Sequence, residues 1–304
     1  PRVGSRLTRV AVPALLALFC VGVAMAAPTG TGAAEPALSI SIPAISDGVL
    51  ALAQAPSGER VLLNGGPGTS SATALLGQYL RPWDRIVDLA VATDPREAYV
   101  LGLPRVLERY RTGVLLDSTA EYASAAHRHL RNTARRHHVA RSVPQPGTEY
   151  VVGRTLRVEI LGEPDLAGSA PATMSPPRSA PGGAAAPLTL RLRWGAFSLL
   201  VPGDLSPAEH RRLLAGAQAL HSTAVLLTAR ATRDPNTAAL LRAAEPELVI
   251  VQGELRAAPG TTSPPSFQPV PLGGDMPEPT WHFTAQGGPV RLEVSHGEYR
   301  IIRR

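Results

Sequence analysis

The chain has 304 residues, which is enough for one or two domains with a full hydrophobic core. Hydrophobic residues make up 44% of it, which excludes a disordered chain, and aromatic residues only 4%, so Leu, Val and Ala must build the core. All 30 basic residues are arginine, and the net charge of +6 is compatible with phosphate contact or with an ordinary arginine-rich surface. The single cysteine, Cys20, excludes an internal disulfide and a cysteine-based zinc site.

The first predicted element is an uncharged hydrophobic segment, Val10–Ala27, that follows a short arginine-rich stretch. A helix of that length, at about 1.5 Å per residue, nearly crosses a hydrocarbon core of about 30 Å. The same pattern, ending in small residues, is also typical of a signal peptide. Because the chain starts with Pro1 rather than Met, it resembles the tail of a longer protein, which favours the membrane helix. Arginine on its N-terminal side then places the following chain outside the cytoplasm.

Residues 28–37 form a predicted linker, and an α/β pattern follows over 38–304. Apolar and alternating runs predict strands at 38–43, 48–53, 60–64, 86–92 and 113–117. Helical patterns predict helices at 70–80, 104–111 and 119–137. The stretch "APSGER" between the second and third strands predicts a hairpin turn.

The second half repeats this order, with predicted strands at 154–161, 188–194, 197–204, 223–228 and 247–251. A Pro/Ala/Gly-rich stretch at about 163–187 is typical of a mobile insertion. Ser206, followed by Pro207 and Glu209, predicts a helix with a capping box, and Asp234 before a proline predicts the start of another. The runs at 281–285, 290–294 and 298–303 predict a closing set of antiparallel strands. Two such halves predict one two-sheet α/β domain with helices outside.

Several of these stretches carry a resemblance to a known family. They include "ERVLLNGGP", "DLAVATDPREAYVLGLPRVLERY", "LRLRWGAFSLLVPGDLSPAEHRRLL" and "AVLLTARATRDPNTAALLRAAEPELVIV". The chain over nearly all of 38–303 resembles the C-terminal metallo-β-lactamase-like domain of the ComEC family, the bacterial competence membrane proteins that form a DNA-uptake channel. The resemblance implies a metallo-β-lactamase-like αββα sandwich, preceded by one hydrophobic N-terminal helix.

The resemblance also places the family's metal ligands, and most of those positions hold other residues here. The equivalent positions are "SDGV" (46–49), Asn64, Asp94, Arg96, Ala98, Tyr99, Asp204 and the run 230–233. Only the aspartate of the "GD" turn keeps its identity, as Asp204, so Asn64, Asp94, Tyr99 and Asp204 are interpreted as vestigial metal positions. Arginine at 96, 230 and 233 opposes a bound cation by Coulomb's law. We therefore expect no catalytic residue and no cofactor, with zinc or manganese as the alternative.

Arginines are the candidate phosphate ligands. Arg96, Arg230 and Arg233 fall in the region of the old metal pocket, where guanidinium groups can hold a phosphate by paired hydrogen bonds. Arg128, Arg131 and Arg135 share one face of the predicted helix at 119–137, whose alternative role is a solvated surface. In that helix His127 and His129 point to different faces, as do His137 and His138, which disfavours a metal site. We expect His210, His221, His282 and His296 to be surface or half-buried residues.

Three functions follow from these patterns. The first is a membrane-tethered, catalytically inactive domain of a ComEC-type DNA-uptake protein, a pseudoenzyme with a structural or DNA-contacting role. Its expected partners are the DNA backbone, the membrane through 10–27, and channel helices of the same or a neighbouring protein. The second is an exported metal-dependent phosphodiesterase or nuclease with an unusual ligand set. The third is an exported binding protein unrelated to DNA.

Overall fold

Two mixed β-sheets organise the chain in a computed structural model that describes residues 37–117, 124–161, 187–216, 219–255, 268–273 and 277–303. In the first sheet, neighbouring strands follow the order β15 (Glu298–Arg303), β14 (Val290–Ser295), β1 (Leu38–Ile42), β2 (Ala51–Gln54), β3 (Arg60–Leu63), β4 (Ile86–Ala92), β5 (Arg111–Asp117) and β6 (Ala140–Ser142). Strands β3 to β6 are parallel to one another, whereas β15, β14, β1, β2 and β3 pair antiparallel in that order.

The second sheet repeats this plan. Its strands follow the order β13 (Thr280–Phe283), β12 (Leu248–Gln252), β11 (Ala224–Thr228), β10 (Phe197–Val201), β9 (Thr189–Trp194), β8 (Leu156–Leu161) and β7 (Glu149–Val152). Strands β10 to β13 are parallel, and β7 to β10 pair antiparallel. Each sheet therefore gathers the carboxyl ends of parallel strands at one edge, where ligand sites of α/β proteins commonly lie.

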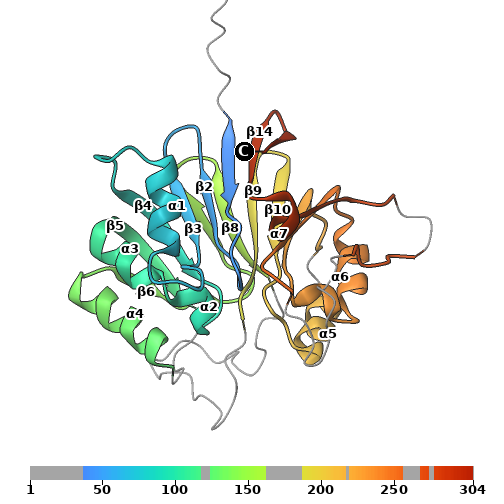
Figure 1. Cartoon of the computed structure of the whole chain (residues 1–304), viewed down its shortest axis with the longest axis horizontal. Helices are drawn as coiled ribbons and strands as arrows, with labels where there is room; N and C mark the ends of the chain where they lie inside the picture. The colour runs from blue at the N-terminus through green and yellow to red at the C-terminus, as the bar shows by residue number, and fades with distance from the viewer. Residues whose placement is uncertain are drawn as a thin grey trace, which may run out of the picture. The chain divides into compact units, whose positions relative to one another are not determined.

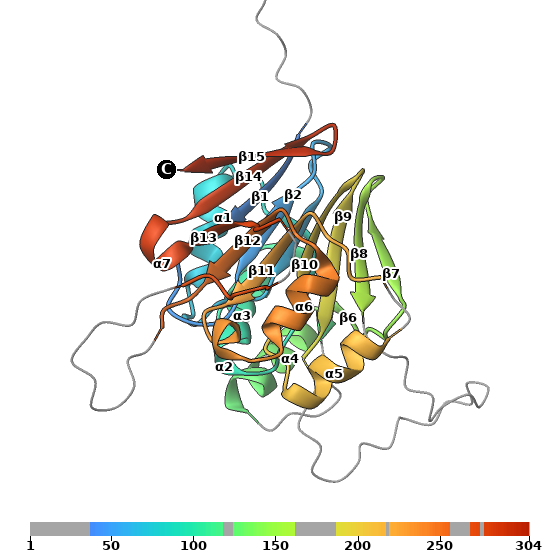
Figure 2. The same cartoon turned by 90° about the vertical axis from the view of Figure 1, so that its right-hand side faces the viewer.

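Helices cover the outer faces of both sheets. Figure 1 shows α1 (Ser71–Tyr79), α3 (Leu103–Arg109) and α4 (Ala125–Arg136) on the outer side of the first sheet. The outer side of the second sheet carries α5 (Pro207–Ala215) and α6 (Thr237–Ala244), which face the viewer in Figure 2. The short helices α2 (Glu97–Val100), η2 (Ala231–Arg233) and α7 (Thr284–Gly287) lie in the connections. The predicted αββα sandwich, with two sheets between outer layers of helices, is confirmed.

Side chains that alternate along each strand explain how both faces of the second sheet are packed. In β11 and β12 every residue of the apolar run is buried, but successive side chains join different clusters. Leu226 and Ile250 pack into the core between the sheets, whereas Val225 and Val249 pack against the layer of α5 and α6. A period of two places these side chains on opposite faces, so continuous apolar runs are required in strands that are covered on both faces.

Local signals predicted several element boundaries. Ser206 caps α5, and the Ser206 and Glu209 side chains form the expected capping box with the backbone, while Pro207 takes the first helical position. The helix predicted at Asp234 begins later, at Thr237, because the Asp234 carboxylate accepts the Asn236 backbone N–H in a turn (2.8 Å). The polar helix predicted from residue 119 begins at Ala125 in the part that is described, after the cap Ser124. Helix α2 and strands β6 and β7 were not predicted from the sequence.

The predicted closing set of antiparallel strands is wrong for its first member. Strand β13 pairs in parallel with β12 and belongs to the second sheet. The chain then passes through α7 to the first sheet, where β14 and β15 form the expected hairpin beside β1. The partner β12 is the preceding strand, but residues 253–279 separate the two strands, so local patterning could not identify the pairing.

Two predicted segments lie outside the described residues, namely the hydrophobic segment Val10–Ala27 and the Pro/Ala/Gly-rich stretch at about 163–187. Within the described ranges, every helix is too short or too polar to cross a bilayer. The first predicted domain boundaries, 1–27 and 28–37, also stay predictions.

A buried glutamine joins the two sheets at the edge where parallel strands end. Gln252, at the end of β12, is fully buried, and its side-chain amide donates to Pro43 O (2.6 Å) and Leu50 O (2.9 Å). Its carbonyl accepts the Leu50 N–H at 2.9 Å. The amide thus satisfies three backbone groups of the β1–β2 connection, of which the two on Leu50 are buried.

We expect Gln252→Leu to lower the free energy of unfolding by about 2–4 kcal/mol, because it leaves buried backbone groups without partners. Denaturant unfolding followed by circular dichroism measures the change. The exposed Gln78→Leu variant on α1 is the control and should change stability by less than about 0.5 kcal/mol. Equal stability of the two variants would contradict the role assigned to Gln252.

Candidate functional site

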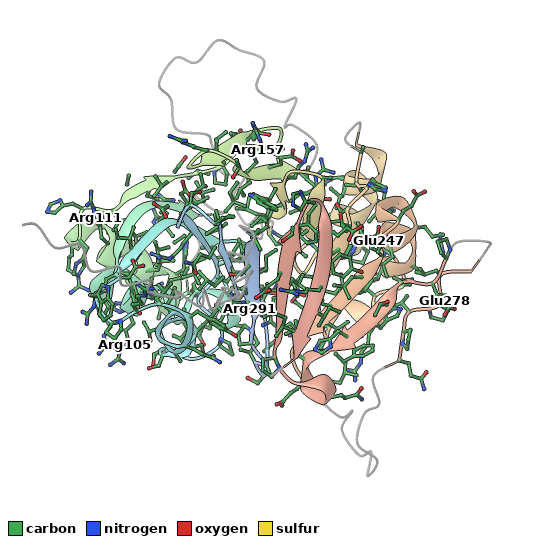
Figure 3. All side chains as sticks on the ribbon, turned by 90° about the horizontal axis from the view of Figure 1, so that it is seen from above. Arg105, Arg111, Arg157, Glu247, Glu278 and Arg291 are labelled. Atoms are coloured by element: carbon green, nitrogen blue, oxygen red, sulfur yellow. The ribbon has the colours of Figure 1, made fainter. Side chains whose placement is uncertain are left out.

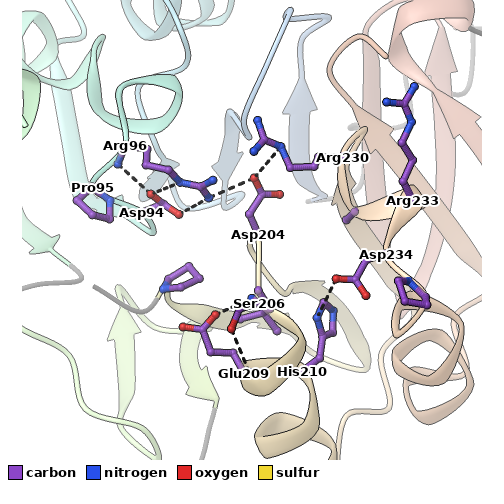
Figure 4. A pocket seen from close by; sticks show the side chains of 14 residues that line it. Asp94, Pro95, Arg96, Asp204, Ser206, Glu209, His210, Arg230, Arg233 and Asp234 are labelled. Carbon is purple, nitrogen blue, oxygen red and sulfur yellow. Dashed lines mark hydrogen bonds and ion pairs between the residues drawn. The ribbon is translucent and has the colours of Figure 1, made fainter. Parts of the chain in front are cut away.

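A cleft of about 650 Å³ lies at the carboxyl ends of β4, β10 and β11. The loop after β4 contributes Asp94, Pro95 and Arg96, and the segment after β10 contributes residues from Asp204 to His210. The connection from β11 to α6 contributes residues between Arg230 and Pro235. Figure 4 shows that charged side chains from these three connections converge around Asp204.

Asp94 and Arg96 form a rigid turn on the first-sheet side of the cleft. The buried Asp94 carboxylate accepts the Arg96 backbone N–H at 2.8 Å and the Arg96 Nε–H at 2.9 Å. Its second oxygen accepts from Arg96 Nη2, so the guanidinium is held in a bidentate pair. The extended backbone of Arg96 precedes α2, whose first backbone bonds return to Arg96 O.

Asp204 provides the matching carboxylate from the second sheet. Its side chain is 7% exposed and accepts a hydrogen bond from Arg96 Nη2 at 3.1 Å. The Thr228 hydroxyl, at the end of β11, donates to its other oxygen and also accepts the Ala231 N–H at 3.1 Å. One guanidinium therefore bridges two buried carboxylates that come from the two sheets.

Electrostatics fix the charge state of this bridge. Burial lowers the pKa of Arg96, but the hydrogen bonds and charge of Asp94 outweigh that effect and hold the pKa of Arg96 above its usual range. Arg96 is therefore always a cation here, and it neutralises carboxylates that would otherwise repel each other.

Tyr99 lies beneath the bridge, at a position where the family resemblance would place a histidine. Its side chain is 1% exposed, and the Arg96 guanidinium lies 5.2 Å from the ring centroid. Burial first, and then the negative charge of Asp204, raise the pKa of Tyr99 well above its usual range. Its hydroxyl makes no hydrogen bond to the described residues. Tyr99 is thus a neutral buried phenol.

Asn64 has a structural position in place of the family's aspartate. Its backbone is left-handed (φ 63°), a conformation that asparagine tolerates, and its N–H donates to Val91 O at 2.7 Å. Its side-chain oxygen accepts from the Thr93 N–H (2.7 Å) and the Thr93 hydroxyl (3.1 Å). Asn64 therefore fixes the end of β4 just before Asp94.

The glycine pair after Asn64 brings the α2–α3 junction close. A Cβ on Gly65 would lie 2.4 Å from Leu103 N, and one on Gly102 would lie 2.2 Å from Gly65 O. Only glycine permits this backbone approach at both positions, which holds α2 and Tyr99 against the cleft.

Arg230 and Arg233 enter the cleft differently. Arg230 Nε lies 3.8 Å from Asp204 Oδ2, and Arg230 Nη2 lies 4.0 Å from Asp47 Oδ2, while two thirds (66%) of its side chain is exposed. Its guanidinium is directed toward Asp204 in Figure 4, whereas that of Arg233 is directed away along the wall. Asp47 belongs to "SDGV" (46–49), a stretch that the resemblance places at the family's metal ligands, but the sequence did not predict its pairing with Arg230.

Two histidines correct the sequence prediction of surface or half-buried positions. His210 is 2% exposed and lines the cleft, with its Nδ1 3.7 Å from Asp234 Oδ2. His282 is 4% exposed, and its Nε2 lies 3.0 Å from Gly288 O. His221 and His296 are exposed as expected. The buried positions follow from tertiary packing of α5 and β13, which the sequence spacing did not reveal.

A second buried charge cluster adjoins the site at the end of β5. Asp117 and His127 are both fully buried, with Oδ1 and Nε2 2.8 Å apart, and Arg141 Nε donates to Asp117 Oδ2 at 2.7 Å. Burial raises the pKa of Asp117, but the hydrogen bonds of His127 and Arg141 outweigh this and lower it. His127 was predicted on a solvated helix. The sequence signal for this burial is that Ala126, Leu130 and Ala134 recur every four residues on the buried face of α4, and His127 lies beside them.

The predicted phosphate-binding arginines of α4 do not line the cleft. Arg128 and Arg135 are exposed, and Arg131 is half-buried. Arg135 donates to Asn132 within the same helix. The cleft thus collects Arg96, Arg230 and Arg233 from the predicted set, and α4 carries the rest on a neighbouring surface.

Comparisons with known proteins address the fold. No family model and no curated protein matches the sequence. Solved structures that are similar include the metallo-β-lactamase fold protein YhfI from Bacillus subtilis, at 10% identity and a TM-score of 0.47 over 71% of this chain and 85% of that one. The diiron β-hydroxylase CmlA from Streptomyces venezuelae follows at 17% identity and 0.44, over 72% of this chain and 44% of that one. Zn²⁺-bound PqqB from Methylobacterium extorquens is 12% identical with a TM-score of 0.40, over 62% of this chain and 71% of that one.

These comparisons correct the expectation of a domain without a cofactor. PqqB is bound to Zn²⁺ and CmlA is a diiron enzyme, so the similar structures include metal-dependent proteins. The expectation of no cofactor was drawn from the arginines at the ligand positions. It was therefore a statement about the metal-binding side chains of this chain and not about its fold.

The donors of this cleft fit a transition metal poorly. Among the described residues, no group of three or more His, Cys, Asp or Glu side chains is placed to hold a metal ion. The converging carboxylates Asp94 and Asp204 already accept hydrogen bonds from Arg96, and a zinc or manganese site requires several free donors at about 2.0–2.3 Å. We therefore derive no chemical step through a metal.

We expect Arg96→Ala to lower the free energy of unfolding by about 2–3 kcal/mol, because it leaves Asp94 and Asp204 buried without their counter-charge. Denaturant unfolding measures the loss, and adding Asp204→Asn to Arg96→Ala should recover part of it. Arg96→Lys should rescue poorly, since ammonium cannot reproduce the bidentate fork. Arg105→Ala, an exposed position on α3, is the control. A loss no larger than that of the control would refute the bridge.

Proposed function

We propose that this chain is a DNA-contacting domain of a ComEC-type DNA-uptake protein, and that it holds the phosphate backbone at the cleft without hydrolysing it. The observation that carries the proposal is the Arg230 guanidinium at the mouth of the cleft. It is two-thirds exposed, and its carboxylate neighbours lie at 3.8 Å and 4.0 Å. These separations exceed hydrogen-bond lengths, so its N–H groups can turn to a phosphate.

Arg96 has a different role in this proposal. It is bonded on two sides by Asp94 and Asp204, so it cancels one of their two negative charges rather than attracting an anion. Without that neutralisation the two carboxylates would repel a phosphate that approaches Arg230. The same bonds leave neither carboxylate as a free general base, which supports contact over hydrolysis.

The charge balance of the cleft limits the strength of this binding. Its lining holds one carboxylate more than guanidinium groups, from Asp94, Asp204, Glu209 and Asp234 against Arg96, Arg230 and Arg233. Binding therefore depends on directed contacts at the mouth and on additional arginines nearby. We expect dissociation constants on the order of 10⁻⁴–10⁻⁶ M, the range of non-specific backbone binding.

Helix α4 extends the proposed contact surface for the DNA backbone beyond the cleft. The Ser124 hydroxyl, at the start of α4, donates to Pro95 O at 3.3 Å, which attaches the helix to the cleft loop. Arg128 follows one turn later, since its N–H donates to Ser124 O at 3.1 Å. The helix extends about 18 Å at about 1.5 Å per residue. A strand that leaves the cleft can therefore pass Arg128, Arg131 and Arg135.

We expect the double variant Arg230→Ala/Arg233→Ala to weaken DNA binding and to reduce the salt dependence of the affinity. Each lost phosphate contact reduces the slope of log K against log salt by about 0.9 for duplex DNA, whatever the base sequence. Fluorescence anisotropy of a labelled duplex over a series of salt concentrations measures both effects.

The control for this experiment is Arg157→Ala/Arg300→Ala, which removes the same charge from strands β8 and β15 outside the cleft lining. A slope that falls equally in both double variants would show general charge attraction instead of a site. Metal-dependent cleavage of the duplex that Asp204→Ala abolishes would instead establish the phosphodiesterase alternative.

The proposal places the domain outside the cytoplasm, attached to the membrane through Val10–Ala27 and contacting channel helices. The support is the uncharged hydrophobic run and the arginines before it. We expect the chain to stay in the membrane pellet after alkaline extraction and to be digested by protease added from outside the inner membrane. Release of a soluble protein whose sequence starts near Ala27 would instead show a cleaved signal peptide.

A further inference from the structure

The loop between α1 and β4 displays two apolar side chains at the end of the first sheet opposite the cleft. Trp83 is 77% exposed and Ile86 is 45% exposed. Large hydrophobic side chains with this exposure are few in the described part of the chain, and the others are Val143 and Val151. Trp83, in the loop, and Ile86, the first residue of β4, thus bring exposed apolar surface together within a few residues.

This loop is held firmly, so the exposure of Trp83 belongs to an ordered structure. The Asp84 N–H donates to Arg81 O at 2.9 Å and closes a turn around Trp83. The buried Arg60 side chain bonds the Asp84 carboxylate and donates to Ile86 O at 3.0 Å. The Arg111 N–H, from the neighbouring strand β5, donates to Arg85 O at 2.8 Å.

The charges around Trp83 are positive. Arg81 lies 5.9 Å from the Trp83 ring centroid, Arg85 and Arg111 are exposed and joined through a backbone hydrogen bond, and Arg109 is exposed at the end of α3. Figure 3, seen from this end, shows Arg105 and Arg111 on the side of the first sheet and Glu247 and Glu278 on the side of the second sheet. The loop is therefore the aromatic centre of a positive surface.

Nearby acidic groups do not cancel this charge. Asp84 is paired with Arg60, and Glu108 lies 3.8 Å from Arg136 Nη2. The half-buried Asp88 accepts the Arg60 backbone N–H at 2.8 Å and is one carboxylate against the four exposed arginines, so the surface keeps a positive charge.

The loop lies at the end where the described chain begins. Strands β1 and β3 run in the same direction, because each pairs antiparallel with β2, and β3 is parallel to β4. Leu38 and Ile86 therefore start their strands at the same end, three strand spacings or about 15 Å apart. Residues 28–37 connect Leu38 to the hydrophobic segment and can extend at most about 35 Å.

We propose that Trp83 and Ile86, with Arg81, Arg85, Arg109 and Arg111, form a docking surface for the anionic headgroups of the membrane. Tryptophan favours the membrane–water interface, where its ring is apolar and its N–H stays hydrated. Arginines are attracted to anionic lipid. Docking by this end directs the cleft, at the opposite ends of the strands, away from the lipid and toward arriving ligand. The proposal rests on the membrane placement above but not on DNA binding.

The test reads Trp83 itself in the full-length chain. Trp194→Phe/Trp281→Phe leaves Trp83 as the remaining tryptophan, and circular dichroism checks the fold. The chain is reconstituted into vesicles of phosphatidylcholine with phosphatidylglycerol, or of phosphatidylcholine alone, each with and without brominated acyl chains. We expect Trp83 emission to shift to shorter wavelength and to be quenched by brominated lipid when phosphatidylglycerol is present. Both effects should decrease at high salt and in Arg81→Ala/Arg85→Ala.

The matched control retains Trp281 instead, through Trp83→Phe/Trp194→Phe. Trp281 is half-buried and stacked 5.8 Å from Phe283 in the second sheet, so its emission should not respond to brominated lipid. Trp83 emission that is unquenched in anionic vesicles, or failure of the chain to float with them, would overturn the proposal. A shift on adding single-stranded DNA without vesicles, and none with vesicles, would assign the surface to nucleic acid. Arg230→Ala/Arg233→Ala should leave the quenching unchanged, which separates this result from the cleft's function.

Discussion

One guanidinium determines how the two sheets meet at their functional edge. Arg96 pairs with Asp94 from the first sheet and with Asp204 from the second, and both carboxylates are buried. Two buried like charges would repel strongly in a medium of low polarity. The cation between them converts that repulsion into attraction, so the turn after β4 and the turn after β10 can close on one another. The positions of Thr228, Tyr99 and Arg230 depend on this contact.

The same contact determines what the cleft can bind. The oxygen atoms of Asp94 and Asp204 that face one another are occupied by Arg96, so any other cation must compete with a covalently attached one. A tethered cation has lost little freedom on binding compared with a free ion. The cleft floor therefore keeps one net negative charge from three ionised groups, and Arg230 at the mouth offers the donors for an anion. This arrangement suits weak contact with an anion better than coordination chemistry.

Sequence patterns predicted the parts of this architecture that depend on neighbouring residues. Apolar runs located the strands of both sheets except β6 and β7, and Ser206 with Glu209 located a helix start to the residue. Patterns could not find β13's parallel partner, because a strand of that length pairs equally well either way and its neighbour is distant in sequence. They also missed the burial of His127 and the approach of Asp47 to Arg230, since both result from packing between separate elements. Arg96, Arg230 and Arg233 were predicted as one group, but the carboxylate partners that distinguish their roles were not.

The parallel strands give the domain two chemically different ends. Strand β4 runs from the loop that holds Trp83 to the loop that holds Asp94, and its seven residues span about 23 Å at about 3.3 Å each. At the cleft end Arg96 is paired with buried carboxylates, and at the other end Arg81 lies 5.9 Å from the centroid of the exposed Trp83 ring. The strands between them are hydrogen-bonded and buried on both faces, so they behave as a rigid spacer. A surface that fixes one end in space therefore also fixes the direction in which the cleft opens, without any conformational change between them.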